Sequence, residues 1–304
     1  MKKAGYNHSF ALGAISGSAC LGMLIPPSVL LIVWGIITED SIGKLFVAGV
    51  IPGILLALLY VTYNLVRAIM KPQLAPEPDQ VGLTTKLTKT EIYSGFSIIA
   101  LIFLVLGGIW GGIFTATEAA GMGAIASFII ALCKGMNFKG VVDSVIDAGK
   151  TSAPIMILLI TAGMYSRFLS LSDINSIILE AITSVGLNQF AILIMMVVIW
   201  LVLGMLLDSI SIILLTVPLF IHLVPEMNPY AFAIFGILAI EAGLLTPPFG
   251  LIVYTVKGVL TGSNDNVPLG TIFMGSIPYW IMMLFVMIMV YLIPELASWP
   301  TKFV

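Results

Sequence analysis

Long apolar stretches without a charged residue run through almost the entire chain. They are residues 9–38, 45–66, 92–117, 119–133, 151–166, 182–207, 209–225, 242–256 and 267–294. Several of them reach the roughly 20 residues that a helix needs to cross a bilayer. A transmembrane barrel would instead show short segments of alternating hydrophobicity. The pattern therefore predicts an all-α polytopic membrane protein.

The composition excludes other classes of protein. Only 9% of the 304 residues are charged, whereas a soluble domain carries roughly 25%. The 13 Lys and Arg do not outnumber the 15 Asp and Glu, so the basic excess of a nucleic-acid-binding protein is missing. The two cysteines, Cys20 and Cys133, lie in apolar stretches and form neither a disulfide framework nor a metal cluster. These features argue against a soluble enzyme, a disordered chain and a nucleic-acid partner.

The distribution of Lys and Arg predicts the orientation in the membrane. Four of these cations lie in residues 67–89 and three in residues 134–150, so both stretches are expected in the cytoplasm. The links 39–44, 170–188 and 222–230 carry mostly acids and are expected on the opposite side. With the N-terminus and Lys257 inside, ten of the 13 cations are cytoplasmic.

We expect four regions along the chain. Residues 1–43 form the broken helix of an incomplete first repeat. Residues 44–150 form scaffold helices with a cytoplasmic linker at 71–91, and 266–304 form the last scaffold helix and a tail. Residues 151–265 form a second repeat with an outer hairpin (188–225) and a broken helix (230–260). Two short interfacial helices are expected at 85–94 and 173–184.

A proline-containing motif occurs twice. Residues 22–28 read Gly-Met-Leu-Ile-Pro-Pro-Ser, and residues 243–249 read Gly-Leu-Leu-Thr-Pro-Pro-Phe. A proline pair removes two backbone donors and clashes with the preceding turn, so each helix should unwind inside the membrane and expose carbonyl groups that suit a hard cation. The predicted topology sends the two copies across in opposite directions, an arrangement typical of inverted-repeat secondary transporters. The alternative is a pair of purely architectural kinks.

Acidic residues inside the apolar stretches are further candidates. Asp208 lies in the middle of the expected hairpin, where an ionisable side chain is functional by default, although it could also cap the second arm. Glu241 precedes the second proline pair and either holds an unwound backbone amide or lines an ion pathway. Glu118 is expected to take part in a helix cap with Thr115 or Thr117.

Four motifs together resemble the large membrane (M) subunit of a tripartite ATP-independent periplasmic (TRAP) transporter. They are the residues 22–28 quoted above, Gly-Gly-Ile-Trp-Gly-Gly-Ile-Phe-Thr-Ala-Thr-Glu-Ala (107–119), Gly-Met-Leu-Leu-Asp (204–208) and Glu-Ala-Gly-Leu-Leu-Thr-Pro-Pro-Phe-Gly (241–250). The chain corresponds to the C-terminal two-thirds of such a subunit. The first inward hairpin of the family is missing, so we expect a fragment or a separately encoded remainder.

The resemblance implies an inverted-repeat elevator transporter of the bacterial inner membrane that imports a small organic acid. C4-dicarboxylates and sialic acid are examples of such substrates. A periplasmic binding protein would deliver the acid, and a small membrane (Q) subunit would brace the scaffold in the lipid bilayer. Sodium would be the coupling ion, and no cofactor is expected.

The resemblance also implies site residues. The first sodium site would use Gly22, Ile25 and Pro26 together with the missing hairpin. The second sodium site would use six residues, namely Gly204, Asp208, Ser209, Gly243, Thr246 and Pro247. The substrate carboxylate would meet Ser28, Ser211 and Thr246, close to the positive ends of the half-helices that follow the two proline pairs.

Three other interpretations compete with this one. A stand-alone sodium–dicarboxylate symporter would need no soluble receptor, and a truncated gene product would insert without transporting. An intramembrane enzyme is disfavoured because the chain has no His-Glu-x-x-His motif and its two histidines, His8 and His222, are assigned to opposite faces. A phosphate-binding GxxxxGK[ST] loop is also missing, which argues against an ATP-driven pump.

Overall fold

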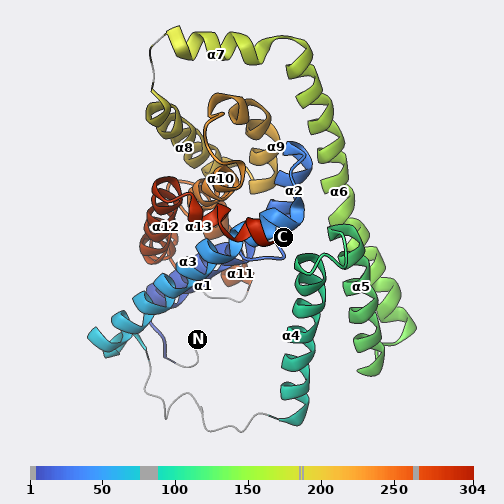
Figure 1. Ribbon diagram of the computed structural model, residues 1–304. Coiled ribbons are helices and arrows are strands. Elements are labelled where there is room, and N and C mark those ends of the chain that lie inside the picture. The colour runs from blue at the N-terminus through green and yellow to red at the C-terminus, as the bar shows by residue number, and fades with distance from the viewer. Residues whose placement is uncertain (1–4, 76–87, 185, 187, 263–266) are drawn as a thin grey trace. The chain divides into compact units, whose positions relative to one another are not determined.

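Every regular element in the described part of the chain is a helix (Figure 1). The computed structural model describes residues 5–75, 88–184, 186, 188–262 and 267–304. The chain divides into two units, one of Met1–Leu83 with Ser166–Lys302 and the other of Thr84–Tyr165 with Phe303–Val304. The first unit carries both proline motifs and the expected hairpin.

The first unit contains ten α-helices with three short 3-10 turns among the residues described, and the second contains α4, α5 and most of α6. The bounds are α1 (His8–Leu24), α2 (Val29–Thr38), α3 (Ile42–Met70), η2 (Pro72–Leu74), α4 (Lys89–Trp110), α5 (Ala116–Cys133), α6 (Phe138–Leu171), α7 (Ile174–Ser184), α8 (Gln189–Leu206), α9 (Ser209–Phe220), η4 (Ile221–Leu223), α10 (Pro229–Gly243), α11 (Leu251–Gly262), α12 (Leu269–Leu292), α13 (Glu295–Ser298) and η5 (Pro300–Phe303).

Seven helical segments are long and apolar enough to cross a membrane, judged by length and composition over the described residues. They are His8–Thr38, Ile42–Met70, Lys89–Trp110, Ala116–Cys133, Phe138–Leu171, Gln189–Leu206 and Leu269–Leu292. The predicted all-α polytopic membrane protein is thereby confirmed. The orientation of the helices and the boundaries of the four regions stay predictions.

Short polar side chains decide where many of these helices begin. Asn188 and Asp208 each accept a hydrogen bond from the backbone N–H three residues later, at 2.8 and 3.0 Å. Such caps satisfy donors that a helix start leaves without a partner. Thr115 and Glu118 form a reciprocal capping box at the start of α5. The expectation that Glu118 takes part in a cap is confirmed, with Thr115 as the capping residue.

Helix α10 lies at the centre of the first unit. It packs against α8, α12 and α3, and all of its residues from Ala231 to Gly243 are buried. A helix that is apolar on every side belongs in the interior of a bundle. The fully buried Trp34 and Trp200 approach it from α2 and α8, with ring centroids 5.6 and 5.9 Å from that of Phe232.

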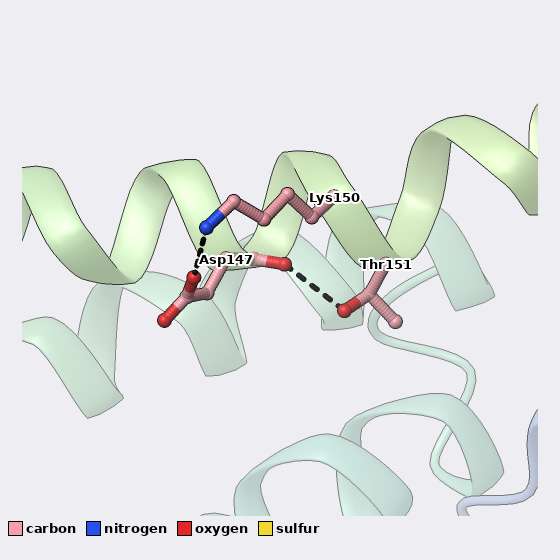
Figure 2. A network of polar contacts seen from close by, with 3 residues as sticks. All are labelled: Asp147, Lys150 and Thr151. Carbon is pink, nitrogen blue, oxygen red and sulfur yellow. Dashed lines mark hydrogen bonds and ion pairs between the residues drawn. The ribbon is translucent and has the colours of Figure 1, made fainter.

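Helix α6 joins a charged stretch to an apolar one. It runs without interruption from Phe138 to Leu171 and so includes residues 138–150 as well as the apolar stretch 151–166. Figure 2 shows two contacts on the polar part of this helix: Lys150 pairs with Asp147 at 3.1 Å, and the Thr151 hydroxyl donates to the Asp147 carbonyl at 2.9 Å. Side chains three or four residues apart meet on a helix surface and stabilise it.

One of the two predicted short helices is corrected by the structure. A separate interfacial helix was expected at 85–94, but residues 89–94 are the first turns of α4, because Thr88 and Glu91 form a capping box there. Residues 85–87 lie outside the described part of the chain. Helix α7 ends at Ser184 and α8 begins at Gln189, after the Asn188 cap, so the apolar stretch 182–207 is shared between two helices. Helix α7 matches the second expected short helix.

Candidate functional site

The first proline pair interrupts a helix. Helix α1 ends at Leu24 and α2 begins at Val29, with a cis peptide bond between Pro26 and Pro27. Because proline has no N–H, Pro26 cannot donate to the carbonyl of Gly22 as a helical residue would. Ser28 is the N-cap of α2. Its hydroxyl accepts from the N–H of Leu31 at 3.4 Å and donates to the carbonyl of Met23.

The second proline pair interrupts a helix in the same way, but the gap is longer. Helix α10 ends at Gly243 and α11 begins at Leu251, with a cis bond between Pro247 and Pro248. The carbonyls at this end of α10 are not left bare. Thr246 donates to two of them, through its hydroxyl to Ala242 at 2.6 Å and through its N–H to Gly243 at 3.0 Å. The Ala242 carbonyl also accepts from the N–H of Leu245 at 3.2 Å. Since a carbonyl oxygen has two lone pairs, the Gly243 carbonyl is the one of these two that keeps capacity for a cation.

The two broken helices pass each other in opposite directions. Cys20 of the first lies beside Glu241 of the second, with 4.0 Å between its Sγ and the Glu241 carbonyl. Further along the first, Trp34 stacks edge-on against Phe232, at a centroid distance of 5.6 Å. From the first contact to the second, residue numbers increase from 20 to 34 along the first broken helix and decrease from 241 to 232 along the second. The segments therefore run antiparallel and in contact.

Helices α8 and α9 fold back on each other as a hairpin. The indole N–H of Trp200 on α8 donates to the hydroxyl of Thr216 on α9 at 2.8 Å. These residues stand at equal distances in sequence on either side of Asp208, which lies in the turn. Asp208 is exposed and caps α9, and its second carboxylate oxygen accepts from the Ser211 hydroxyl at 2.5 Å. The predicted capping role is confirmed. The position of this turn in a bilayer stays a prediction.

The hairpin tip meets the end of α10 at two places. Gly204 and Gly243 bring the two backbones together: a Cβ atom on Gly204 would lie 2.8 Å from the Gly243 Cα. Beside this contact, the Ser209 hydroxyl donates to Oε1 of Glu241 at 2.6 Å. Glu241 is 2% exposed, and its other oxygen, Oε2, is buried without a hydrogen-bond partner.

The structure therefore brings together only some of the predicted site residues. Gly204, Ser209 and Gly243 of the second proposed sodium site lie side by side next to Glu241. Of the same set, Asp208 and Pro247 are exposed at the surface.

The residues of the first proposed site pack against α3. A Cβ atom on Gly53 would lie 2.6 Å from Ile25, and one on Gly49 would lie 3.7 Å from Pro26. Gly22 is exposed, with nothing within 4 Å of a Cβ atom built on it. The two candidate substrate serines, Ser28 and Ser211, already make hydrogen bonds within the chain. The binding roles of these residues stay predictions.

Two contacts of the site were not anticipated. Sequence reasoning treated Cys20 as one more residue of an apolar stretch and did not pair Ser209 with Glu241. A signal existed for the pair, since a carboxylate inside an apolar helix needs a buried donor, and the chain offers Ser209 at a turn. No such signal pointed to Cys20, because its neighbour is a backbone carbonyl 221 positions away.

Comparison with known proteins shows the family of the chain. A family model described as "Tripartite ATP-independent periplasmic transporter, DctM component" matches residues 1–296. The chain is 30% identical to the C4-dicarboxylate TRAP transporter large permease protein DctM of Pseudomonas aeruginosa, over 98% of this chain and 68% of that protein. The chain is 31% identical to the Vibrio cholerae protein of the same name, over 98% of this chain and 69% of that protein.

A more distant relative is larger. The sialic acid TRAP transporter permease protein SiaT of Haemophilus influenzae is 27% identical over 98% of this chain, which spans 48% of that protein. The match to the family model covers both broken helices and the hairpin. The chain is therefore a multi-pass inner-membrane protein that belongs to the DctM family, the large permease component of tripartite ATP-independent periplasmic transporters.

Proposed function

We propose that this chain forms the transport pathway of a sodium-coupled importer of small organic acids. In this proposal a periplasmic binding protein hands over the acid and a small membrane subunit braces the scaffold. The relatives are named for C4-dicarboxylate and sialic acid transport, which supports an organic acid as the class of substrate. The protein would need no cofactor besides the coupling ion.

One observation carries the proposal: two proline-split helices run antiparallel and in contact, and a hairpin tip lies against one of them. Cys20 and Glu241 mark one end of this contact, and Trp34 and Phe232 mark the other. In inverted-repeat transporters the substrate and ion sites lie between such discontinuous helices. Purely architectural kinks would not require a second helix with the opposite direction beside the first.

The chemistry of the site supports sodium as the coupling ion. The groups near the breaks are carbonyl, hydroxyl and carboxylate oxygens, which suit a hard cation. We assign the second ion to the hairpin tip and the second break, with Gly204, Ser209 and Gly243 at the centre of that region. Asp208, Thr246 and Pro247 border it, and Gly22, Ile25 and Pro26 form this chain's part of the first site.

The energy required is within reach of the membrane potential. One sodium ion that moves inward across 100 mV releases about 2.3 kcal/mol before any concentration gradient is counted. Two such ions would therefore drive a monoanion inward against a substantial gradient. The N-terminal ends of α2 and α11, which follow the two breaks, carry partial positive charge that would attract the carboxylate.

Uptake in proteoliposomes tests the proposal. The permease assembly is reconstituted with a labelled organic acid, with and without an inward sodium gradient and with and without the binding protein. We expect uptake only when both are present. Uptake without the binding protein would instead identify a stand-alone symporter. Uptake that ignores the sodium gradient would contradict the coupling.

A further inference from the structure

A small polar cavity lies in the first unit, at the start of α1. Its volume is about 60 Å³, and its walls come from the beginning of α1, the end of α3, η2 and α12. A cavity needs roughly 10–15 Å³ to hold one water molecule, so this one has room for a few waters or one small anion. It is separate from the two proline breaks and from the hairpin tip.

Arg67 is the one charged side chain among the described residues that line this cavity. Its Nε is buried and has no hydrogen-bond partner. The guanidinium carbon lies 5.9 Å from the centroid of the Tyr63 ring, which supports the side chain from one side. A guanidinium has five donors and no acceptor. The unpartnered Nε–H therefore remains as a donor for a ligand with an acceptor oxygen.

Ring contacts and a hydrogen bond hold the aromatic wall beside Arg67. The ring of Tyr279 packs edge-on against Tyr60 and Tyr63, with centroid distances of 4.9 and 5.6 Å. Its hydroxyl donates to Oδ1 of Asn64 at 2.5 Å. Because that proton is used in this bond, the Tyr279 hydroxyl is not available to donate to a ligand, and Arg67 remains the charged side chain that can. These contacts position the aromatic side chains before a ligand binds, which lowers the entropic cost of binding.

The backbone of α1 adds to the positive character of the cavity. Asn7 caps this helix and accepts from the N–H of Phe10 at 3.2 Å. The first N–H groups of the helix, including that of Ser9, have no partner within the helix and carry partial positive charge. Helix α12 approaches the start of α1 closely because residue 275 is a glycine. A Cβ atom on Gly275 would lie 2.1 Å from the Ser9 carbonyl oxygen.

We propose that this cavity binds a phosphate group through Arg67. A planar guanidinium pairs with phosphate through two parallel hydrogen bonds. Arg67 stands just before the end of α3, and Asn7 just before the start of α1. Ends of membrane-spanning helices lie at the level of the lipid headgroups. The phosphate therefore comes either from a phospholipid headgroup or from free phosphate in the adjoining solution.

Binding to the purified chain in detergent, in phosphate-free buffer, tests the proposal. Three probes are titrated by calorimetry: a short-chain phosphatidylglycerol, the matching diacylglycerol without phosphate, and inorganic phosphate. We expect phosphatidylglycerol to bind and diacylglycerol not to bind. Arg67→Gln should weaken binding by about tenfold or more, because a charge-assisted hydrogen bond is lost. Arg167→Gln, which changes the only other arginine, should leave binding unchanged.

The outcomes separate the two sources and keep the proposal open to refutation. Inorganic phosphate that binds as tightly as the lipid identifies free phosphate as the ligand, and much weaker binding identifies the headgroup. Equal binding to the wild-type chain and Arg67→Gln, or no binding of either phosphate probe, would overturn the proposal. If Arg67→Gln does not fold, Arg67→Lys takes its place in the test. Lysine keeps the positive charge but loses the planar fork of the guanidinium. Weaker binding of the phosphate probes to Arg67→Lys supports the site, and unchanged binding refutes it.

Discussion

The hydroxyl of Ser209 donates a 2.6 Å hydrogen bond to Oε1 of Glu241. This bond joins the first residue of α9 to a residue near the end of α10, and so connects the hairpin tip to the second broken helix. Both residues are buried. If the hairpin moves relative to α10 during transport, this is a bond that has to break.

Replacement of Glu241 tests the strength of that connection. Glu241→Leu removes the acceptor and leaves the buried Ser209 hydroxyl unpaired, so we expect a loss of about 1–2 kcal/mol in the free energy of unfolding. Glu241→Gln keeps an acceptor oxygen and should recover most of it. Thermal unfolding in detergent measures the difference. Glu226→Gln, at an exposed position, is the matched control. A Leu variant as stable as the wild type would show that the bond contributes nothing.

The contact between Gly204 and Gly243 should tolerate no side chain. Each Cβ atom would lie about 3 Å or less from backbone atoms of the other helix, so Gly204→Ala must separate α8 from α10. We expect a lower melting temperature and little uptake. By contrast, Gly258→Ala has free space around its Cβ atom and should be neutral or slightly stabilising, because alanine favours a helix. Equal behaviour of the two variants would refute the close contact.

Asp208 allows capping and ion binding to be separated. Asp208→Asn keeps a side-chain oxygen that caps α9, so its unfolding should match that of the wild type. Asp208→Ala should lose about 1 kcal/mol of stability. If Asp208 also binds sodium, the Asn variant will need a higher sodium concentration for half-maximal uptake. An unchanged sodium dependence in Asp208→Asn would leave capping as its role.

Thr246 is the test of the second proposed sodium site. Its hydroxyl donates to the Ala242 carbonyl at 2.6 Å, and a hydroxyl oxygen that donates keeps lone pairs with which it can bind a cation. Thr246→Ala should reduce the sodium dependence of uptake, whereas Thr246→Ser keeps the hydroxyl and should retain it. Normal sodium-dependent uptake by Thr246→Ala in the assembled transporter would show that the site has been misplaced.

Labelling of introduced cysteines tests the predicted topology. Thr38→Cys and Asp265→Cys should react with a membrane-impermeant reagent from opposite sides, because they follow the two antiparallel breaks. Asp265 itself lies outside the described residues. The background needs Cys133→Ser, since Cys133 is exposed, while Cys20 is buried. Reaction of both positions from one side would contradict the inverted arrangement.

The sequence by itself determined the class of fold, the interruptions and several helix starts. These features depend on local chemistry: apolar runs longer than a bilayer is thick, proline pairs that lack donors, and the capping side chains of Thr115 and Asp208. Local signals misjudged the short helix expected at 85–94, because they did not show that residues 89–94 continue into the span of α4 after the Thr88–Glu91 capping box.

Only the tertiary structure decided which parts of the site meet. The contacts Ser209–Glu241, Gly204–Gly243 and Cys20–Glu241 join residues that are 32 or more positions apart. Periodicity along a chain carries no information about such distances, because they depend on how helices pack side by side. The close approach of two glycines and the burial of one carboxylate are consequences of that packing.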